Sequence, residues 1–121
     1  FVDDVAAVDV ATTGAAIAHS APYYADGTNV NFVEVTAADG LNVRTFERGV
    51  EAETLSCGTG VTAAAIGAHL SKRVTAEKIS IHTKGGILTV SFTATSNGYK
   101  AVVLQGPATP VYKGQWEITT K

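Results

Sequence analysis

The 121-residue sequence contains no methionine, one cysteine and three prolines, and only 17% of its residues are charged. A single cysteine excludes an internal disulfide and leaves too few ligands for a cysteine-based zinc site. The small share of charged residues, beside 45% hydrophobic residues, argues against a disordered chain. The composition is therefore typical of one globular domain that buries its own core.

The net charge of −2 gives no reason to expect nucleic acid or an anionic membrane surface as a partner. No apolar run reaches the roughly 18 residues that cross a bilayer, and no signal peptide opens the sequence, so we expect a cytoplasmic protein. The chain has no methionine and begins with Phe1-Val2-Asp3-Asp4, which reads like the interior of a strand. We therefore expect it to be part of a longer translation product.

The single cysteine lies directly before a run that favours a helix. Cys57 is followed by Gly58-Thr59-Gly60 and then by residues 61–70, which contain no Asp, Glu, Lys or Arg. The free N–H groups and the positive dipole end of a helix N-terminus favour an anion, so a thiolate there could act as a base or a nucleophile. The glycines keep side chains away from the helix start, which favours the approach of a small anionic ligand. The alternative interpretation is an unreactive buried cysteine.

Most of the remaining sequence predicts β-structure, because polar and apolar residues alternate between turn-forming pairs such as Asp39-Gly40, Gly85-Gly86 and Asn97-Gly98. The expected helices are residues 5–18, in which a glycine weakens the pattern, and residues 58–72. The expected strands are residues 29–36, 41–47, 78–83, 87–93, 99–105, 110–112 and 115–119.

The second helix has no polar face, so we expect it to be buried on all sides. Its alanines and glycines let strands approach closely. The predicted fold class is therefore α+β: a curved, mixed, mostly antiparallel sheet, barrel-like in form and wrapped around a central apolar helix. A doubly wound sheet would need alternating strands and helices, which the sequence does not show.

Three polar segments surround the cysteine helix in the predicted fold: residues 27–32, residues 46–49 and residues 53–60. Asn29 lies two residues before another asparagine on one strand face, and Glu47 and Arg48 end the next strand. Each feature alone has an ordinary explanation, a turn for the asparagines and a solvated surface pair for Glu47 and Arg48. Together they bring amide, carboxylate, guanidinium and thiol groups to one edge, which suits a small zwitterionic ligand.

In this order and spacing, the segments resemble the C-terminal half of the diaminopimelate epimerase family. That family carries a GTNVNF-like strand, an ERG segment and a CGTG or CGSG helix start. Residues 85–86, 105–108 and 111–114 also resemble its closing strands, and the resemblance covers essentially the whole chain. The proline racemase-like and phenazine-biosynthesis-like proteins share the wider fold and sometimes the Cys-Gly-Thr-Gly helix start.

The resemblance implies a cofactor-independent amino-acid epimerase that interconverts L,L- and meso-diaminopimelate, a precursor of lysine and peptidoglycan. In the family, two cysteines from two similar domains face opposite sides of the α-carbon, and one removes the proton while the other supplies one. The implied catalytic residues here are Cys57, as the base acting on the L,L isomer, and Glu47, which also contacts substrate and acts on the thiol.

The same resemblance implies the substrate-binding residues. Gly58 and Thr59 match residues whose backbone N–H groups bind the reacting carboxylate. Asn29 and Arg48 match positions that hold the distal end of the substrate.

One departure from the family is large, because its other cysteine and an Asn and His motif just before Phe1 are missing. We therefore expect residues 1–121 to be a single domain, the C-terminal half of a two-domain epimerase, and to be inactive alone. The expected partners are diaminopimelate and the missing N-terminal domain, with a homodimer as a further option. Two alternatives stay open: a non-catalytic amino-acid-binding domain of this fold, and a racemase of the proline racemase type.

Overall fold

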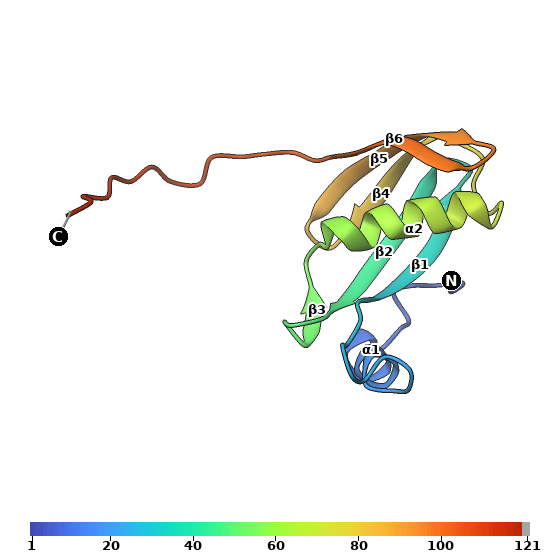
Figure 1. Cartoon of the computed structure of the whole chain (residues 1–121), viewed down its shortest axis with the longest axis horizontal. Coiled ribbons are helices and arrows are strands. Elements are labelled where there is room, and N and C mark those ends of the chain that lie inside the picture. Colours follow the sequence, from blue (N-terminus) through green and yellow to red (C-terminus); the bar gives the residue numbers. More distant parts are fainter. Residues whose placement is uncertain (120–121) are drawn as a thin grey trace.

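The computed structural model describes residues 1–119 as one mixed sheet with two helices (Figure 1). The sheet order is β1-β2-β4-β5-β6, and the short β3 pairs with β2. All neighbouring strands are antiparallel except β2 and β4, which are parallel. The elements are α1 (Val10–Ala18), β1 (Val30–Ala37), β2 (Gly40–Glu47), β3 (Ala52–Thr54), α2 (Gly58–Leu70), β4 (Lys78–Thr83), β5 (Gly86–Thr95) and β6 (Gly98–Gln105).

Tight turns join the antiparallel neighbours, as the sequence predicts. Gly86 and Gly98 open the strands after two of these turns with φ angles of 131° and 136°, which side chains rarely adopt. A parallel pair cannot be joined by such a turn. The chain therefore passes from β2 to β4 through β3 and α2, and this crossover places α2 across one face of the sheet (Figure 1).

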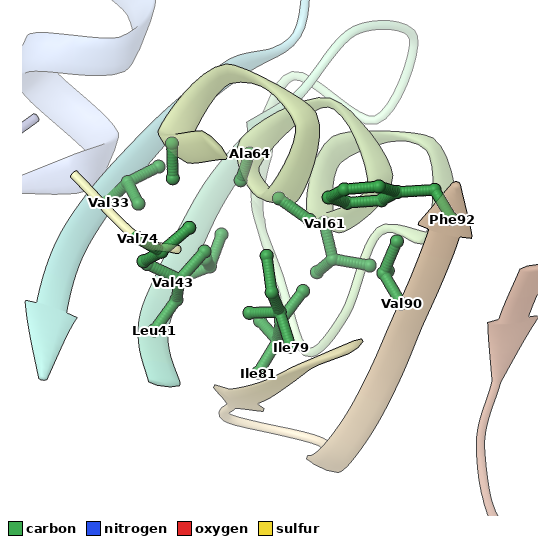
Figure 2. Close-up of a cluster of buried hydrophobic side chains, with 12 residues drawn as sticks. Val33, Leu41, Val43, Val61, Ala64, Val74, Ile79, Ile81, Val90 and Phe92 are labelled. Carbon is green, nitrogen blue, oxygen red and sulfur yellow. The ribbon is translucent and has the colours of Figure 1, made fainter. Parts of the chain in front are cut away.

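The main core lies between α2 and the sheet. Figure 2 shows Val61 and Ala64 of α2 facing the side chains of the strands. Val61 and Ala65 are fully buried, and the small side chains on this helix face allow close packing against the sheet. The sheet contributes the large buried side chains Leu41, Val43, Ile79, Ile81, Val90 and Phe92.

The prediction that α2 is buried on all sides is wrong. Thr59, Ala63 and Leu70 are exposed, and Leu70 retains 71% of its accessible surface. The sheet is also open rather than a closed barrel, with β1 and β6 at its two edges. Within residues 1–119 there is one sheet layer, and a single layer covers only one face of a helix.

The first helix starts later than predicted, at Val10 rather than residue 5. Asp9 is its N-cap, and its carboxylate accepts a hydrogen bond from the N–H of Thr12 at 3.1 Å. Val5 is buried in the turn before the helix, where its N–H donates to the Glu34 carboxylate at 3.0 Å. Val5 and Val8 extend the apolar helical pattern back through this turn, so the pattern did not identify Asp9 as the N-cap.

A glycine in α1 also has a packing reason. A Cβ at Gly14 would overlap the side chain of Phe46, so α1 can approach β2 closely only because this position has no side chain. The weak helical pattern at Gly14 therefore reflects a helix–sheet contact.

The two strands predicted at residues 110–112 and 115–119 are not formed. Residues 106–119 continue from β6 as an extended segment that leaves the body of the domain (Figure 1). Val111, Tyr112, Trp116 and Ile118 are 85–91% exposed. An alternating apolar pattern becomes a strand only where another strand offers its backbone groups, and within residues 1–119 none lies beside this segment.

The other strand predictions are confirmed to within two residues at each end, whereas the three-residue β3 was not predicted. Among the described residues, no helix is long and apolar enough to cross a membrane.

Candidate active site

Cys57 is the N-cap residue of α2, where the sequence places it. Its backbone is extended (φ −130°, ψ 110°), its C=O accepts the first helical hydrogen bond from Val61 at 2.9 Å, and its side chain makes no capping bond. The N–H groups before Val61 therefore have no partner within the helix and are free for an anion. Cys57 is also 6% exposed, so the thiol lies at the surface of the core rather than in solvent.

Two polar groups lie next to the sulfur. The Nδ2 of Asn29 donates to Cys57 Sγ at 3.7 Å, and Thr59 Oγ1 lies 3.5 Å from the sulfur. The sequence did not predict these two side-chain contacts, and the role of Cys57 as a base stays a prediction.

Asn29 connects the thiol with the Arg48 segment. Its Oδ1 accepts a hydrogen bond from the backbone N–H of Arg48 at 2.8 Å, while its Nδ2 donates to Cys57. The Arg48 guanidinium donates from Nη1 to the C=O of Asp26 at 3.2 Å, and its methylene groups pack on Gly27, where a Cβ would lie 3.1 Å away. These contacts hold Arg48 beside the helix start.

A second asparagine, which the sequence analysis did not select as a site residue, fixes α2 against β1. Asn31 Oδ1 accepts a hydrogen bond from Thr45 Oγ1 at 2.8 Å. The backbone of Gly60 packs directly on this amide, because a Cβ at Gly60 would overlap Asn31 Oδ1. Gly60 therefore lets the first turn of α2 reach the strand, and the two-residue spacing of Asn29 and Asn31 was the signal for this contact.

These contacts border an open cavity of about 350 Å³ at the start of α2. Its lining residues are Gly27, Thr28, Asn29, Asn31, Arg48, Thr59, Gly60 and Ala63. The structure thus brings Asn29, Arg48 and Thr59 together in one cavity at the start of α2.

Cys57, Glu47 and Gly58 lie outside the cavity lining, although Cys57 contacts its lining residues Asn29 and Thr59. Glu47 is the last residue of β2, is partly buried, and makes no side-chain hydrogen bond or ion pair with the rest of residues 1–119. Because side chains alternate along a strand, Glu47 lies on the same face as Thr45, whose hydroxyl donates to Asn31. Gly58 lines a neighbouring apolar hollow with Leu104. The roles of both residues stay predictions.

An ion network lies behind the segment that leads to Cys57. The Glu53 carboxylate accepts hydrogen bonds from Arg44 Nε and Nη2 at 2.7 and 2.9 Å and from Lys84 Nζ at 2.8 Å. The Arg44 hydrogen bond, followed by Lys84, lowers the pKa of Glu53 to about 2 from its usual 4.5, against the opposing effect of burial. No local pattern in the sequence indicates this network, because Arg44, Glu53 and Lys84 lie on β2, on β3 and in the β4–β5 turn.

The lowered pKa of Glu53 predicts a loss of stability in acid. A carboxyl whose pKa is lower in the folded than in the unfolded chain contributes stability above the unfolded value of 4.5, and that stability is lost as the pH falls toward 2. The contribution is at most about 3 kcal/mol, reduced by solvent around the exposed Lys84. Urea unfolding at about pH 6 and about pH 3 measures it. Glu53→Gln should remove most of the difference, whereas Glu117→Gln in the exposed C-terminal segment should leave it unchanged.

His69, near the C-terminal end of α2, belongs to the core rather than to the site. Its Nδ1 lies 2.9 Å from the hydroxyl of Tyr99, and its ring packs edge-on against Phe92 and Tyr99. Across residues 1–119, no three His, Cys, Asp or Glu side chains gather where they could hold a metal ion.

Comparison with known proteins identifies the family. The sequence profile described as diaminopimelate epimerase matches residues 1–111. Proteins named diaminopimelate epimerase from Chlorobaculum tepidum and Flavobacterium psychrophilum are 44% and 42% identical over 94% and 93% of this chain. The Aquifex aeolicus protein of the same name is 43% identical over 94% of the chain.

The chain spans 44% of the length of the first two of these relatives and 40% of the third. Among solved structures, the Bacillus anthracis phenazine biosynthesis protein of the PhzF family has a similar fold. The TM-score is 0.52 and the identity 22%, with 72% of this chain and 27% of that chain covered, so this likeness concerns the fold alone. The family profile and the close relatives agree, and this chain belongs to the diaminopimelate epimerase family.

Proposed function

We propose that this chain is the Cys57-bearing half of a cytoplasmic enzyme that interconverts L,L- and meso-diaminopimelate by two-base proton transfer. The observation that carries the proposal is the position of Cys57 at the N-terminus of α2, beside a cavity lined by Asn29, Arg48 and Thr59. Family membership supplies the substrate class. No step needs a cofactor, because both bases are side chains.

The chemistry begins with the Cys57 thiolate. It removes the α-proton of the L,L isomer, so that the C–H bond breaks, an S–H bond forms and the electron pair moves into the adjacent carboxylate. The charge that builds there is stabilised by N–H groups that are fixed before the reaction starts. The backbone N–H groups of Gly58 and Thr59 lie at the helix start and are the proposed donors.

Recognition of the rest of the substrate falls to the strand ends. Arg48 would pair with the distal carboxylate, since a guanidinium can bind a carboxylate with two parallel hydrogen bonds. Asn29 holds the Arg48 backbone and reaches the thiol, so it links the distal and reacting ends of the site. Glu47 is the proposed partner of an ammonium group and the residue that acts on the thiol.

Inversion needs a second acid on the opposite face of the α-carbon, and this chain has one thiol. We infer that the second thiol comes from the part of the relatives that this chain does not span. That N-terminal domain would cover the outer face of α2, where an apolar hollow of about 480 Å³ is lined by Gly58, Thr59, Thr62, Ala63, Ile66 and Leu104. A homodimer of the chain could cover the same face when that domain is missing.

Arg48→Ala in the full-length enzyme tests the assignment of the distal site. A charged hydrogen-bonded contact is worth about 1.5–3 kcal/mol, so kcat/KM should fall by roughly tenfold to a hundredfold, with little change in the urea midpoint. Asn29→Ala should cause a loss of the same order. Steady-state kinetics with L,L-diaminopimelate measures both.

Arg73→Ala is the matched control, because Arg73 follows the far end of α2 and stacks on the Phe1 ring at 4.4 Å. Its kcat/KM should equal that of the unmodified enzyme. Unchanged kinetics in Arg48→Ala and Asn29→Ala would return both residues to a structural role. Substrate binding without any turnover in the unmodified enzyme would favour the non-catalytic binding domain.

A further inference from the structure

The segment that leads into Cys57 is held by the turn between β4 and β5. The N–H of Gly85 donates to the C=O of Leu55 at 2.7 Å, and Lys84 Nζ donates to the Glu53 carboxylate at 2.8 Å. Glu53 and Leu55 precede Cys57 by four and two residues. A turn that is distant in sequence therefore contacts both the backbone and a side chain of the thiol-bearing segment.

Arg44 holds the same segment from the other side. Its Nε and Nη2 bind the two oxygens of Glu53, and its Nη1 donates to the C=O groups of Val5 and Val8 at 2.9 and 3.0 Å. The Glu53 side chain is 15% exposed and the Lys84 side chain 49% exposed. Glu53 is thus fixed on the inner side by Arg44, while Lys84 closes the outer side.

The contact at Gly85 is also tight. A Cβ there would lie 3.1 Å from the carbonyl oxygen of Leu55 and 3.3 Å from its Cβ, so any larger residue must push the Leu55 backbone away. The Cys57 side chain makes no capping bond, and within residues 1–119 its sulfur has only the weak hydrogen bonds with Asn29 at 3.7 Å and Thr59 at 3.5 Å. The position of the thiol therefore depends on the segment before it.

We propose that Lys84 and Gly85 are positioning residues: the β4–β5 turn clamps residues 53–55 and so sets the place of the Cys57 thiol at the start of α2. The clamp acts through Glu53 and Leu55, and neither Lys84 nor Gly85 lines the cavity. Its consequence for catalysis rests on the proposed function, whereas its effect on the thiol does not.

Alkylation of the single thiol tests the clamp without any need for enzymatic activity. Because Cys57 is 6% exposed, iodoacetamide reaches it after a local opening of the segment, and loosening the clamp makes that opening more frequent. Lys84→Met and Gly85→Ala in the 121-residue chain should each raise the alkylation rate by about threefold to tenfold. The urea midpoint of Lys84→Met should fall only slightly, because Lys84 is half exposed and Arg44 still binds both oxygens of Glu53.

Two matched controls show whether any lysine or glycine substitution changes the alkylation rate, or only those in the clamp. Lys78→Met changes an exposed lysine at the opposite end of β4, and Gly67→Ala adds a methyl group to α2 where nothing lies within 4 Å. Both should keep the original alkylation rate. Lys84→Arg, which retains a cation able to reach Glu53, should restore it. Alkylation rates in Lys84→Met and Gly85→Ala that equal those of the two controls would overturn the proposal.

The full-length enzyme gives the second readout. There, Lys84→Met should lower kcat with KM retained, because the substrate-binding groups are untouched while the thiol is misplaced. A raised alkylation rate in the chain together with unchanged kcat would support the clamp and count against Cys57 as the base. The clamp and the proposed function can therefore fail separately.

Discussion

Replacing Cys57 by serine in the full-length enzyme is expected to lower kcat/KM for diaminopimelate epimerisation by about 10²–10⁴-fold, the usual contribution of a positioned general base. A serine hydroxyl is not ionised near neutral pH and cannot accept the α-proton as a thiolate does. Folding should not suffer, because serine is a preferred N-cap residue and Cys57 caps α2 without a side-chain bond. The substitution therefore separates chemistry from stability.

The measurement is the rate of conversion between the L,L and meso isomers, with the urea midpoint recorded alongside. Ser56→Ala is the matched control, because it removes an exposed hydroxyl one position away and should retain full activity. A Cys57→Ser enzyme within twofold of the original kcat/KM would contradict the assignment of Cys57 as a base. Loss of activity together with a collapsed urea midpoint would instead identify Cys57 as a structural residue.

The 121-residue chain alone is expected to fold and to show no epimerase activity. It has its own core between α2 and the sheet, so circular dichroism should report ordered structure with a cooperative unfolding transition. A single thiol can reach only one face of the α-carbon. Inversion requires proton removal on one face and delivery on the other, so this chain lacks one of the two groups that the reaction needs.

Proton NMR of diaminopimelate in D₂O tests this expectation, because it follows both the loss of the α-proton signal and the appearance of the other stereoisomer. The full-length enzyme is the positive control and should give exchange with inversion. Slow exchange with retention in the fragment would fit one base that removes and returns protons on the same face. Exchange with inversion by the purified fragment, free of any second domain, would show that the two-thiol argument is wrong.

The outer face of α2 is relevant to both expectations, because it is where a second domain would pack. Ala63 and Leu70 are exposed there, and an apolar hollow beside Leu104 adjoins the helix start. Exposed apolar surface of this kind commonly marks an interaction site. In the proposed enzyme, the same covering domain would bring the second thiol and exclude water from the reacting carbon.

The sequence by itself determined the local features of this protein. It placed Cys57 at the start of α2, located the β4–β5 and β5–β6 turns, and gave the strands between residues 30 and 105 to within two residues, except for β3. These features depend on neighbours in the chain: glycine permits the φ angles that the turns need, and alternation decides which side chains share a strand face. The GTNVNF, ERG and CGTG segments likewise predicted that Asn29, Arg48 and Cys57 lie close together, and the hydrogen bonds of Asn29 to the other two residues agree.

Only the tertiary structure decided how surfaces meet. The absence of a polar face on α2 predicted burial on all sides, yet one sheet layer covers one face of the helix. The alternating residues 110–119 do not form strands, because no strand edge lies beside them within the described chain. The contact of Gly60 with Asn31 and the ion network around Glu53 join residues far apart in sequence. Local pattern sets what a segment can form, but the partners of a face or an edge depend on which other segments the fold brings to it.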